Sequence, residues 1–488
     1  MEPARNPSVE AHDVNDVHEA LARAAELLRI HDELQAMAIA AAEEPGGTPP
    51  DPQRTQRQTQ NLDEIRALLD PLHPADVAYI LEALPRDQRL VVWDLVKADR
   101  DGEILLEVSD AVRETLIAYM DDHELVAATG QLDTDEIADL APDLPREVIE
   151  DVFKLLPPEE REQLREAMSY AEDTAGALMD FDMVQIREDV TLEVVLRYLR
   201  RLDELPDHTD QLFVVDRAEQ LKGLVPVNRL LVTDLDVAVG DVMLKDYTQF
   251  NANDDAADVA AAFERYDLVS APVVDDAGRL VGRMTVNAVV DYTRDKIDSE
   301  KLSAGGLRED EDIFASVWKS VQNRWAWLAL NLITAFIASR VIGLFEGSIG
   351  KLVALAALMP IIAGIGGNSG NQTITMIVRA LALGQITRQN ASKLFVKELS
   401  VSALNGLIWG GLVGIFAFLI YHNWQLSLVM MLAMMLNLLL AASMGVLIPM
   451  AMDKLGRDPA VGSSVMITAI TDSGGFFIFL GLATLFLV

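Results

Sequence analysis

The sequence predicts a multi-domain chain with an all-α cytosolic helical-repeat domain, a tandem pair of α+β modules and an α-helical membrane domain of five transmembrane helices. Three observations support this fold class. Charge is unevenly distributed, one α+β pattern occurs twice, and the last third of the chain contains five long apolar stretches. Residues 1–320 hold 31 basic and 71 acidic side chains, whereas residues 321–488 hold 9 and 5, so an acidic soluble part precedes an almost uncharged part.

The composition excludes several classes of protein. The 488 residues include no cysteine, which excludes disulfide scaffolds and thiolate metal sites. A net charge of −36 repels nucleic acid and attracts cations. We find no nucleophile beside a base, no phosphate-binding loop and no dinucleotide fingerprint, so the chain is not expected to be an enzyme. The first residues show no secretory signal, so the amino end is expected to stay in the cytoplasm, and no obligate protein partner is evident.

Residues 1–60 are expected to form an extension and a linker. Residues 14–43 are predicted to be a helix, and the Pro- and Gln-rich stretch that follows, up to Gln60, is predicted to be flexible. From 61 to 167, apolar residues recur three and four apart, and Leu-Pro steps separate short segments. This range is predicted to be a compact stack of short helices.

An α+β pattern then occurs twice. Two strand pairs recur with an offset of 59 residues: Leu212–Asp216 with Leu221–Val225, and Ala271–Asp275 with Leu280–Met284. Each copy predicts a helix, a β-branched strand, a turn, a second strand and a helix. We place the two modules at 168–240 and 241–290.

These modules resemble a pair of CBS domains, a family whose members often bind adenine nucleotides. In that family the second strand leads into a Gly-x-x-Thr-x-x-Asp pattern, whose hydroxyl and carboxylate hold phosphate and ribose. Pro226 and Arg229 stand at those places in the first copy, and Thr285 and Ala288 in the second. The acid for the ribose is absent from both copies, which argues against nucleotide binding.

The membrane part, 323–488, follows a charged connecting helix at 291–322 that has a break at Gly305-Gly306. Its apolar spans lie at about 325–345, 351–384, 395–421, 425–452 and 459–488. Each is long enough to cross ~30 Å of hydrocarbon at ~1.5 Å per residue. Five crossings and the Lys and Arg of alternate loops predict a multi-pass protein of the plasma (bacterial inner) membrane, with the amino end and the paired modules cytoplasmic and Val488 outside.

The second span carries an unusual polar run from Pro360 to Gln372. The span is too long to cross straight, so it should tilt, break or project beyond the lipid. One interpretation of the run is close helix packing, because Gly366 and Gly370 have the small-xxx-small spacing. The other is an ion path lined by the amides of Asn368 and Asn371 and by backbone carbonyls exposed where the helix geometry relaxes. We expect both to act together.

Asp472 is the only carboxylate of the fifth span and is predicted to lie near the middle of the bilayer. Ser464 and Thr468 precede it at intervals of four and share its face, with Thr471 beside them. A satisfied structural aspartate is the alternative, but acids inside membranes usually face a water-filled path. These residues are therefore our candidate lining of an ion path.

The chemistry of these side chains favours Mg²⁺. Hydroxyl, amide, carbonyl and carboxylate groups are hard oxygen ligands, and the spans contain no histidine except His422 at an outer edge. Mg²⁺ keeps several waters and is usually held by one or two carboxylates, which a dimer with Asp472 from each subunit would supply. A single buried acid could equally relay protons, so the residues alone leave both possibilities open.

The order of parts resembles the MgtE family of magnesium transporters. The motifs that carry the resemblance are the run Pro360 to Gln372, Gly445 to Pro449, Arg457-Asp458-Pro459-Ala460 and Thr471-Asp472-Ser473-Gly474-Gly475. The similarity covers 61–488. It implies a homodimeric, Mg²⁺-selective channel in the lipid membrane, with its pore on the dimer axis and Asp472 as the pore aspartate.

The resemblance also implies regulation. In the family, Mg²⁺ between acidic cytoplasmic surfaces holds the connecting helices together and closes the pore. The candidate regulatory ligands are the acids of the connecting helix, namely Asp291, Asp295, Asp298 and Glu300. Two alternatives remain: a proton- or sodium-coupled divalent cation carrier that uses Asp472 as its relay, and a membrane-anchored CBS sensor module, for which a midplane acid would serve no purpose.

Overall fold

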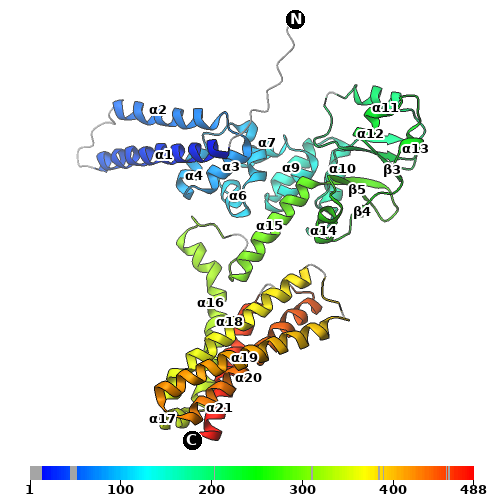
Figure 1. Cartoon of the computed structure of the whole chain (residues 1–488). Helices are drawn as coiled ribbons and strands as arrows, with labels where there is room; N and C mark the ends of the chain where they lie inside the picture. Colours follow the sequence, from blue (N-terminus) through cyan, green and yellow to red (C-terminus); the bar gives the residue numbers. More distant parts are fainter. Residues whose placement is uncertain are drawn as a thin grey trace. The chain divides into compact units, whose positions relative to one another are not determined.

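The structure is a computed structural model that describes residues 14–43, 52–202, 204–308, 311–382, 385–387, 389–457, 459 and 462–488. The chain divides into two compact units (Figure 1). The acidic unit consists of Met1–Lys296 with Asp312–Ala315, and the membrane unit consists of Ile297–Glu311 with Ser316–Val488.

The first part of the acidic unit is helical, as predicted. Its α-helices are α1 (Val14–Glu43), α2 (Pro52–Leu69), α3 (Pro74–Glu82), α4 (Arg86–Trp93), α5 (Asp101–Glu107), α6 (Asp110–Ile117), α7 (Asp122–Thr129), α8 (Thr134–Leu140), α9 (Arg146–Leu155) and α10 (Pro158–Ala167). The Leu-Pro steps mark helix starts, because Pro85, Pro145 and Pro157 are the N-cap residues of α4, α9 and α10.

The amino-terminal helix α1 is confirmed, but the expected linker is wrong for residues 52–60. These residues form the first half of α2, which packs against α1. Pro52 suits a helix start, and Leu28 of α1 and Ile65 of α2 are fully buried in the same hydrophobic core. The described side chains at 53 and 56–60 are exposed or half-buried, so this stretch extends a helix whose second half is packed in the core. The Pro-Gly-Gly step at 45–47 lies outside the described residues.

The two repeated modules have the same topology. The first contains β1 (Gln185–Arg187), α11 (Leu192–Leu199), β2 (Gln211–Val215), β3 (Leu221–Pro226) and α12 (Val227–Val232), and α13 (Val239–Val242) follows it. The second contains β4 (Phe250–Asn251), α14 (Ala256–Tyr266), β5 (Ser270–Val274), β6 (Leu280–Thr285) and α15 (Val286–Ala304). The sheets have the orders β1-β2-β3 and β4-β5-β6, each with one parallel and one antiparallel pairing. The sequence did not predict the short parallel strands β1 and β4.

Each module is completed by the segment that precedes the other module. Asp180 and Arg283 exchange two backbone hydrogen bonds of 2.8 and 2.9 Å, and Leu224 and Leu244 do the same at 3.0 and 2.8 Å. Gly282 leaves room for Met179, since a methyl carbon there would lie 2.7 Å from the sulfur of that methionine. The two modules are therefore interlocked by exchanged segments.

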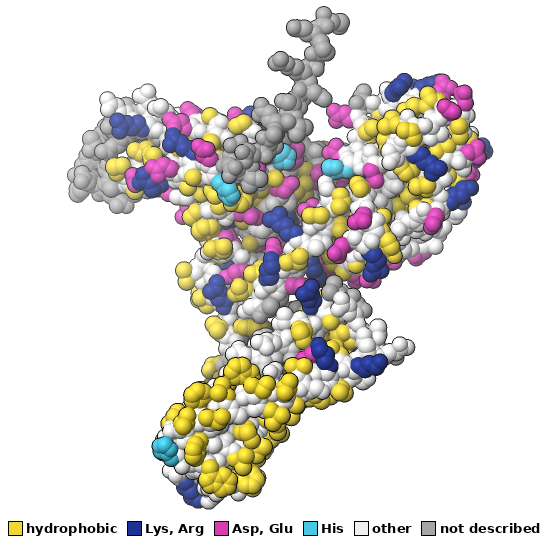
Figure 2. Space-filling model, viewed as in Figure 1, with side chains coloured by type: hydrophobic (Ala, Val, Ile, Leu, Met, Phe, Trp, Pro, Cys, Tyr) yellow, Lys and Arg dark blue, Asp and Glu magenta, His cyan; other side chains and the backbone are white. Residues whose placement is uncertain are grey.

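The helices of the membrane unit match the expected spans. They are α16 (Val317–Gly343), α17 (Glu346–Lys351), α18 (Ala354–Ala382), α19 (Ala391–Tyr421), α20 (Trp424–Lys454) and α21 (Ser463–Phe486). Among the described residues, α16, α19, α20 and α21 are long and apolar enough to cross a membrane. The polar run lowers the hydropathy of α18, which is equally long at 29 residues. The protein is thus a multi-pass membrane protein, and on the face drawn in Figure 2 hydrophobic side chains cover much of the lower part of this unit.

Two expectations for the second span have different outcomes. The chain leaves helical geometry at Leu352, at the start of the expected 351–384 span, so the span itself does not break and its length is left to tilt or projection. The expected relaxation of the helix in the polar run is wrong, because α18 is helical from Ala354 to Ala382 with Pro360 inside it. Close packing on α20 and α21 keeps the glycines in helical conformation.

Candidate ion path in the membrane unit

Helices α18 and α21 pack against each other in antiparallel directions. A methyl carbon on Gly367 would lie 3.8 Å from the Thr471 hydroxyl, and one on Gly370 would lie 2.5 Å from the Ile467 side chain. As α18 advances from Gly367 to Gly370, the contact on α21 therefore moves backwards. The polar run of the second span and the aspartate region of the fifth span, far apart in sequence, are thus neighbours.

This antiparallel contact places the candidate polar residues on one side. A helix turns by about 100° per residue, and in two antiparallel helices the residue after each contact residue turns towards the same flank. On α18 those residues are Asn368 and Asn371, and on α21 they are Thr468 and Asp472. Ser464 lies one turn before Thr468. We call these five residues the polar flank. None of them is buried within the single chain.

Helix α20 covers the opposite flank of the pair. A methyl carbon on Gly366, one residue before the contact, would lie 2.2 Å from Nδ2 of Asn437. A methyl carbon on Gly445 of α20 would lie 2.8 Å from Thr373 of α18. One side of the α18–α21 pair is therefore closed by protein, and the polar flank is not.

The polar flank has free ligand capacity. Thr468 donates its hydroxyl proton to the carbonyl oxygen of Ser464 at 2.9 Å, so the lone pairs of its oxygen remain available. Within the described ranges, the side chains of Asn368, Asn371 and Asp472 make no hydrogen bond or ion pair. Asp472 lies about 14 Å by helix rise from the start of α21 and about 21 Å from its end. An unpaired carboxylate at this depth is the strongest feature of the flank.

Thr471 does not belong to the flank. It is fully buried, and it donates its hydroxyl proton to the carbonyl oxygen of Ile467 at 2.9 Å. It lies against Gly367, in the packing between α18 and α21.

Sequence reasoning missed two polar residues of this unit. Asn437 of α20 has no exposed side-chain surface, and Glu398 of α19 is 4 % exposed with Lys397 at 3.2 Å as its ion-pair partner. Asn437 stands among apolar residues of α20, and that isolation is the signal that could have found it. Glu398 follows Lys397 near the start of α19 and gives no such signal.

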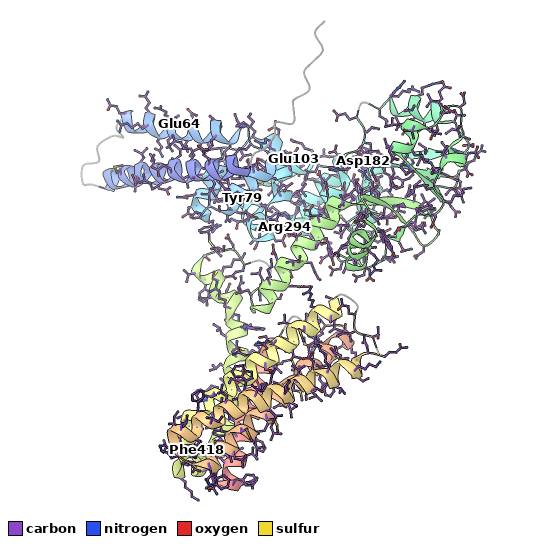
Figure 3. All side chains as sticks on the ribbon, viewed as in Figure 1. Glu64, Tyr79, Glu103, Asp182, Arg294 and Phe418 are labelled. Carbon is purple, nitrogen blue, oxygen red and sulfur yellow. The ribbon has the colours of Figure 1, made fainter. Side chains whose placement is uncertain are left out.

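The candidate regulatory acids separate into two groups. Asp291 and Asp295 of α15 face acids of the helical domain. Partial burial and then the charges of Asp110 and Asp291 raise the pKa of Asp295, and burial followed by the charge of Asp291 raises the pKa of Glu107. Asp298 instead pairs with Lys301 at 2.7 Å, and Glu300 is half-buried. Burial raises the pKa of Asp291. The charge of Arg294, labelled on α15 in Figure 3, offsets part of this effect.

A further acidic region surrounds Asp135 of α8. Burial, followed by the charge of Asp180, raises the pKa of Asp135 to about 7. Asp180 itself pairs with Arg283, a side chain that is almost fully buried. In the described part of the chain, however, no three His, Asp or Glu side chains gather closely enough to hold a metal ion directly.

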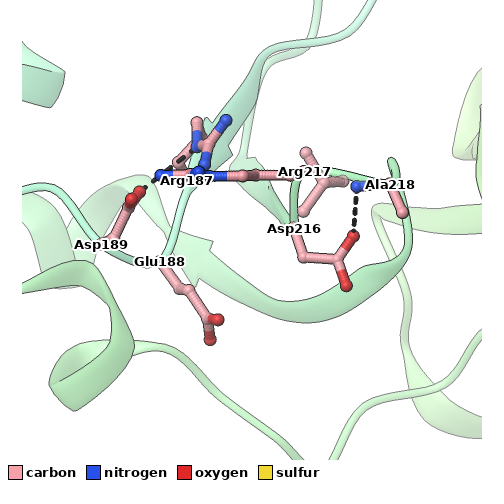
Figure 4. A pocket seen from close by; sticks show the side chains of 7 residues that line it. Arg187, Glu188, Asp189, Asp216, Arg217 and Ala218 are labelled. Carbon is pink, nitrogen blue, oxygen red and sulfur yellow. Dashed lines mark hydrogen bonds and ion pairs between the residues drawn. The ribbon is translucent and has the colours of Figure 1, made fainter.

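The first α+β module has a shallow pocket at the ends of β1 and β2 (Figure 4). Its polar groups bind one another. Asp216 accepts a hydrogen bond of 2.8 Å from the backbone of Ala218, and Arg187 donates one of 3.2 Å to Asp189. The second module uses the Thr285 hydroxyl to accept from the backbone of Ala288 at 3.3 Å, at the start of α15. These groups have local structural roles.

Comparison with known families agrees with this architecture. Residues 359–482 match the MgtE family, described as a divalent cation transporter, 72–173 match the MgtE intracellular N domain, and 239–295 match the CBS domain. A curated "Magnesium transporter MgtE" from Thermus thermophilus is 29% identical over 431 residues, covering 87% of this chain and 95% of its own length. Over most of its length, the chain is therefore similar to MgtE magnesium transporters.

Other similarities extend over the same parts. The "Magnesium transporter MgtE" of Bacillus subtilis is 26% identical, covering 87% of this chain and 94% of its own length. Among solved structures, the cytosolic domain of "the Mg2+ channel MgtE in complex with ATP" is 29% identical, covers 49% of this chain and 98% of its own, and has a TM-score of 0.44. The MgtE match in the membrane unit includes α18 to α21, which hold the whole polar flank.

Proposed function

We propose that this protein is a Mg²⁺-selective channel for magnesium uptake and that the polar flank lines its ion path. The observation that carries the proposal is a mid-helix Asp472 that has no partner among the described residues and lies beside Asn368, Asn371 and Thr468. These residues lie on the side of the α18–α21 pair that α20 leaves open. The names of the relatives support magnesium as the transported ion. Transport needs no covalent chemistry, which fits a chain without a catalytic motif.

The path is completed by a second copy of the chain. One chain offers a single carboxylate on a flank that it does not itself cover, and burying that charge against lipid is unfavourable. If two chains face each other across a two-fold axis, two Asp472 carboxylates, with amides and hydroxyls around them, surround one space. Such a space suits Mg²⁺, which keeps several waters and takes one or two carboxylates.

The acidic unit is the proposed sensor of cytoplasmic Mg²⁺. Asp291 and Asp295 repel Glu107 and Asp110 across the contact between α15 and the helical domain. Divalent ions relieve such repulsion, and their removal restores it. Because no three-acid site is present among the described residues, hydrated Mg²⁺ shared between two acidic surfaces is the mode of binding that fits. Closure at high Mg²⁺ and opening at low Mg²⁺ follow.

Flux through reconstituted vesicles tests this proposal. Purified full-length protein is placed in vesicles containing a Mg²⁺-sensitive dye, and Mg²⁺ on the side of the acidic unit is stepped. We expect Mg²⁺ flux that follows the Mg²⁺ gradient, persists without proton or sodium gradients, and falls as Mg²⁺ on that side rises. Flux tied stoichiometrically to protons or sodium would favour a coupled carrier, and absence of Mg²⁺ flux would overturn the proposal.

A further inference from the structure

Asn437 ties three membrane helices together behind the polar flank. It lies in α20, has no exposed side-chain surface, and donates an Nδ2 proton to the carbonyl oxygen of Ile362 in α18 at 3.0 Å. Its Oδ1 has no hydrogen-bond partner among the described residues. A buried amide thus connects α20 to the turn of α18 that precedes the Gly-Asn segment.

The amide occupies a notch that exists because two neighbouring positions are glycine. A methyl carbon on Gly366 of α18 would lie 2.2 Å from Nδ2 of Asn437, and one on Gly475 of α21 would lie 2.7 Å from the same atom. Neither distance is compatible with a methyl group. By contrast, a methyl carbon on Gly364 of α18 would meet nothing within 4 Å. Among the described glycines, only Gly366 and Gly475 lie this close to Asn437.

These glycines lie next to the candidate ion ligands. Gly366 precedes Asn368 by two residues, about 3 Å along the helix axis, and Gly475 follows Asp472 by three residues, about 4.5 Å. A displacement of either glycine by the Asn437 amide would shift Asn368 or Asp472 along the path. The same side chain contacts both helices, so it sets the position of one relative to the other.

Close packing of the helices does not by itself explain why the side chain at position 437 is an amide. Small residues suffice for close helix association in membranes, and a buried amide oxygen without a partner is unfavourable. A leucine would fill similar space without that cost. A directional hydrogen bond to one carbonyl, however, specifies one axial register of α20 against α18, which an apolar side chain does not.

We propose that Asn437 is a positioning residue that fixes the register of α18 against α21 and thereby the selectivity of the ion path for Mg²⁺ over larger divalent cations such as Ca²⁺. The proposal rests on the proposed channel function. Mg²⁺ demands near-ideal octahedral geometry at short distances, so oxygen ligands discriminate in its favour only if their positions are fixed. Asn437 touches no ion and acts through Ile362, Gly366 and Gly475.

The test compares selectivity with the amount of folded protein. In full-length Asn437→Leu we expect insertion at near wild-type levels, with the ratio of Mg²⁺ to Ca²⁺ permeability lowered about tenfold, the scale on which groups behind metal ligands act. Single-channel recording in planar bilayers measures the ratio and the unit conductance independently of how many channels insert. A purely structural role would reduce the number of channels and leave both quantities unchanged.

A second experiment exchanges the sizes of the side chains at positions 366 and 437. Gly366→Ala should lower thermal stability and selectivity, whereas the matched control Gly364→Ala should behave as wild type. Combining Gly366→Ala with Asn437→Ala makes room for the methyl group, so stability should recover while selectivity stays altered, because the bond to Ile362 is still absent.

Each outcome decides the proposal. Wild-type selectivity and conductance in Asn437→Leu, or equal behaviour of Gly366→Ala and Gly364→Ala, would overturn it. If Asn437→Leu fails to insert, the permeability ratio and the unit conductance are measured in Asn437→Ser, whose side chain is smaller than the notch. The same two results then decide the proposal. If the wild-type protein carries no Mg²⁺, the channel function fails, whereas the stability exchange between positions 366 and 437 still tests the contact itself.

Discussion

In the acidic unit, Arg89 is fully buried and its guanidinium meets Asp312 at 2.8 Å, while its other nitrogens donate to the carbonyl oxygens of Leu81 and Leu84. In the membrane unit, Asn437 is equally buried and carries no charge, and its side chain makes one hydrogen bond to the residues that the structure describes. Some hydroxyls there, such as that of Thr471, donate to a carbonyl oxygen of their own helix. The acidic unit therefore buries a charge within an ion pair, whereas the membrane unit buries a neutral amide. Under the proposed function, protons and divalent ions act on the first unit, and the placement of neutral oxygens around one carboxylate matters in the second.

The largest effect is expected for substitution of Asp472, the carboxylate of the polar flank. Asp472→Ala should reduce Mg²⁺ flux to the level of empty vesicles, because the only carboxylate of the polar flank is lost, while the protein remains folded and inserted. Vesicle flux together with size-exclusion chromatography checks this. Asp453→Ala, an exposed acid at the end of α20, is the matched control and should conduct normally. Normal flux in Asp472→Ala would remove this residue from the path.

The next largest effect concerns the buried charge of the acidic unit. Asp312→Ala leaves the Arg89 guanidinium buried without its carboxylate, which should destabilise the unit by about 3–5 kcal/mol. Hydrogen exchange of the full-length protein across α3 and α4 measures the loss. Asp298→Ala removes an exposed ion pair and should leave exchange unchanged. Equal exchange in the two variants would mean that the Arg89 pair contributes nothing to stability.

A smaller effect tests the response of the acidic unit to protons and Mg²⁺ together. The pKa of Asp135 rises from 3.8 to about 7 in the folded protein, so its contribution to stability is present below pH 3.8 and is lost as the pH rises to about 7. Above that pH the charged acids attract Mg²⁺. Thermal melts should therefore show greater stabilisation by Mg²⁺ at about pH 8 than at about pH 6, and Asp135→Asn should reduce the difference. Equal stabilisation at both pH values would contradict the link.

The smallest effect separates two hydroxyls of one helix. Thr468→Val removes an oxygen from the polar flank and should lower unit conductance a few-fold. Thr471→Val removes a buried hydroxyl that serves its own helix and should leave conductance unchanged. Single-channel recording of both variants measures the contrast. A larger loss in Thr471→Val than in Thr468→Val would place the path on the other side of α21.

The parts that sequence reasoning predicted are those with long, regular patterns. Five apolar spans and a repeat with an offset of 59 residues are visible because burial imposes them over many residues. The start of α2 was missed because residues 52–60 are Pro- and Gln-rich and their described side chains are mostly exposed, and they extend a helix whose Ile65 lies in the same core as Leu28 of α1. Strands β1 and β4 were missed because they contain only three and two residues.

The candidate site was partly predictable for the same reason. Asp472 and its neighbours at intervals of four form a pattern within one helix, and the structure places Thr468 and Ser464 beside it. Asn368 lies on the same flank only because α18 packs against α21 in the antiparallel direction. Neither the choice of neighbouring helix nor the direction of packing can be predicted from one segment alone. Asn437 acts through two glycines on other helices, so its partners become visible only in three dimensions.

The exchanged segments of the two CBS modules have a mechanical consequence. The segment before each module forms an isolated β-bridge to the last strand of the other module, so the two modules cannot separate without breaking both bridges. Stretched from its ends in an optical trap, this pair should open in one step rather than two. A rotation that began at α15 should therefore move the two modules together.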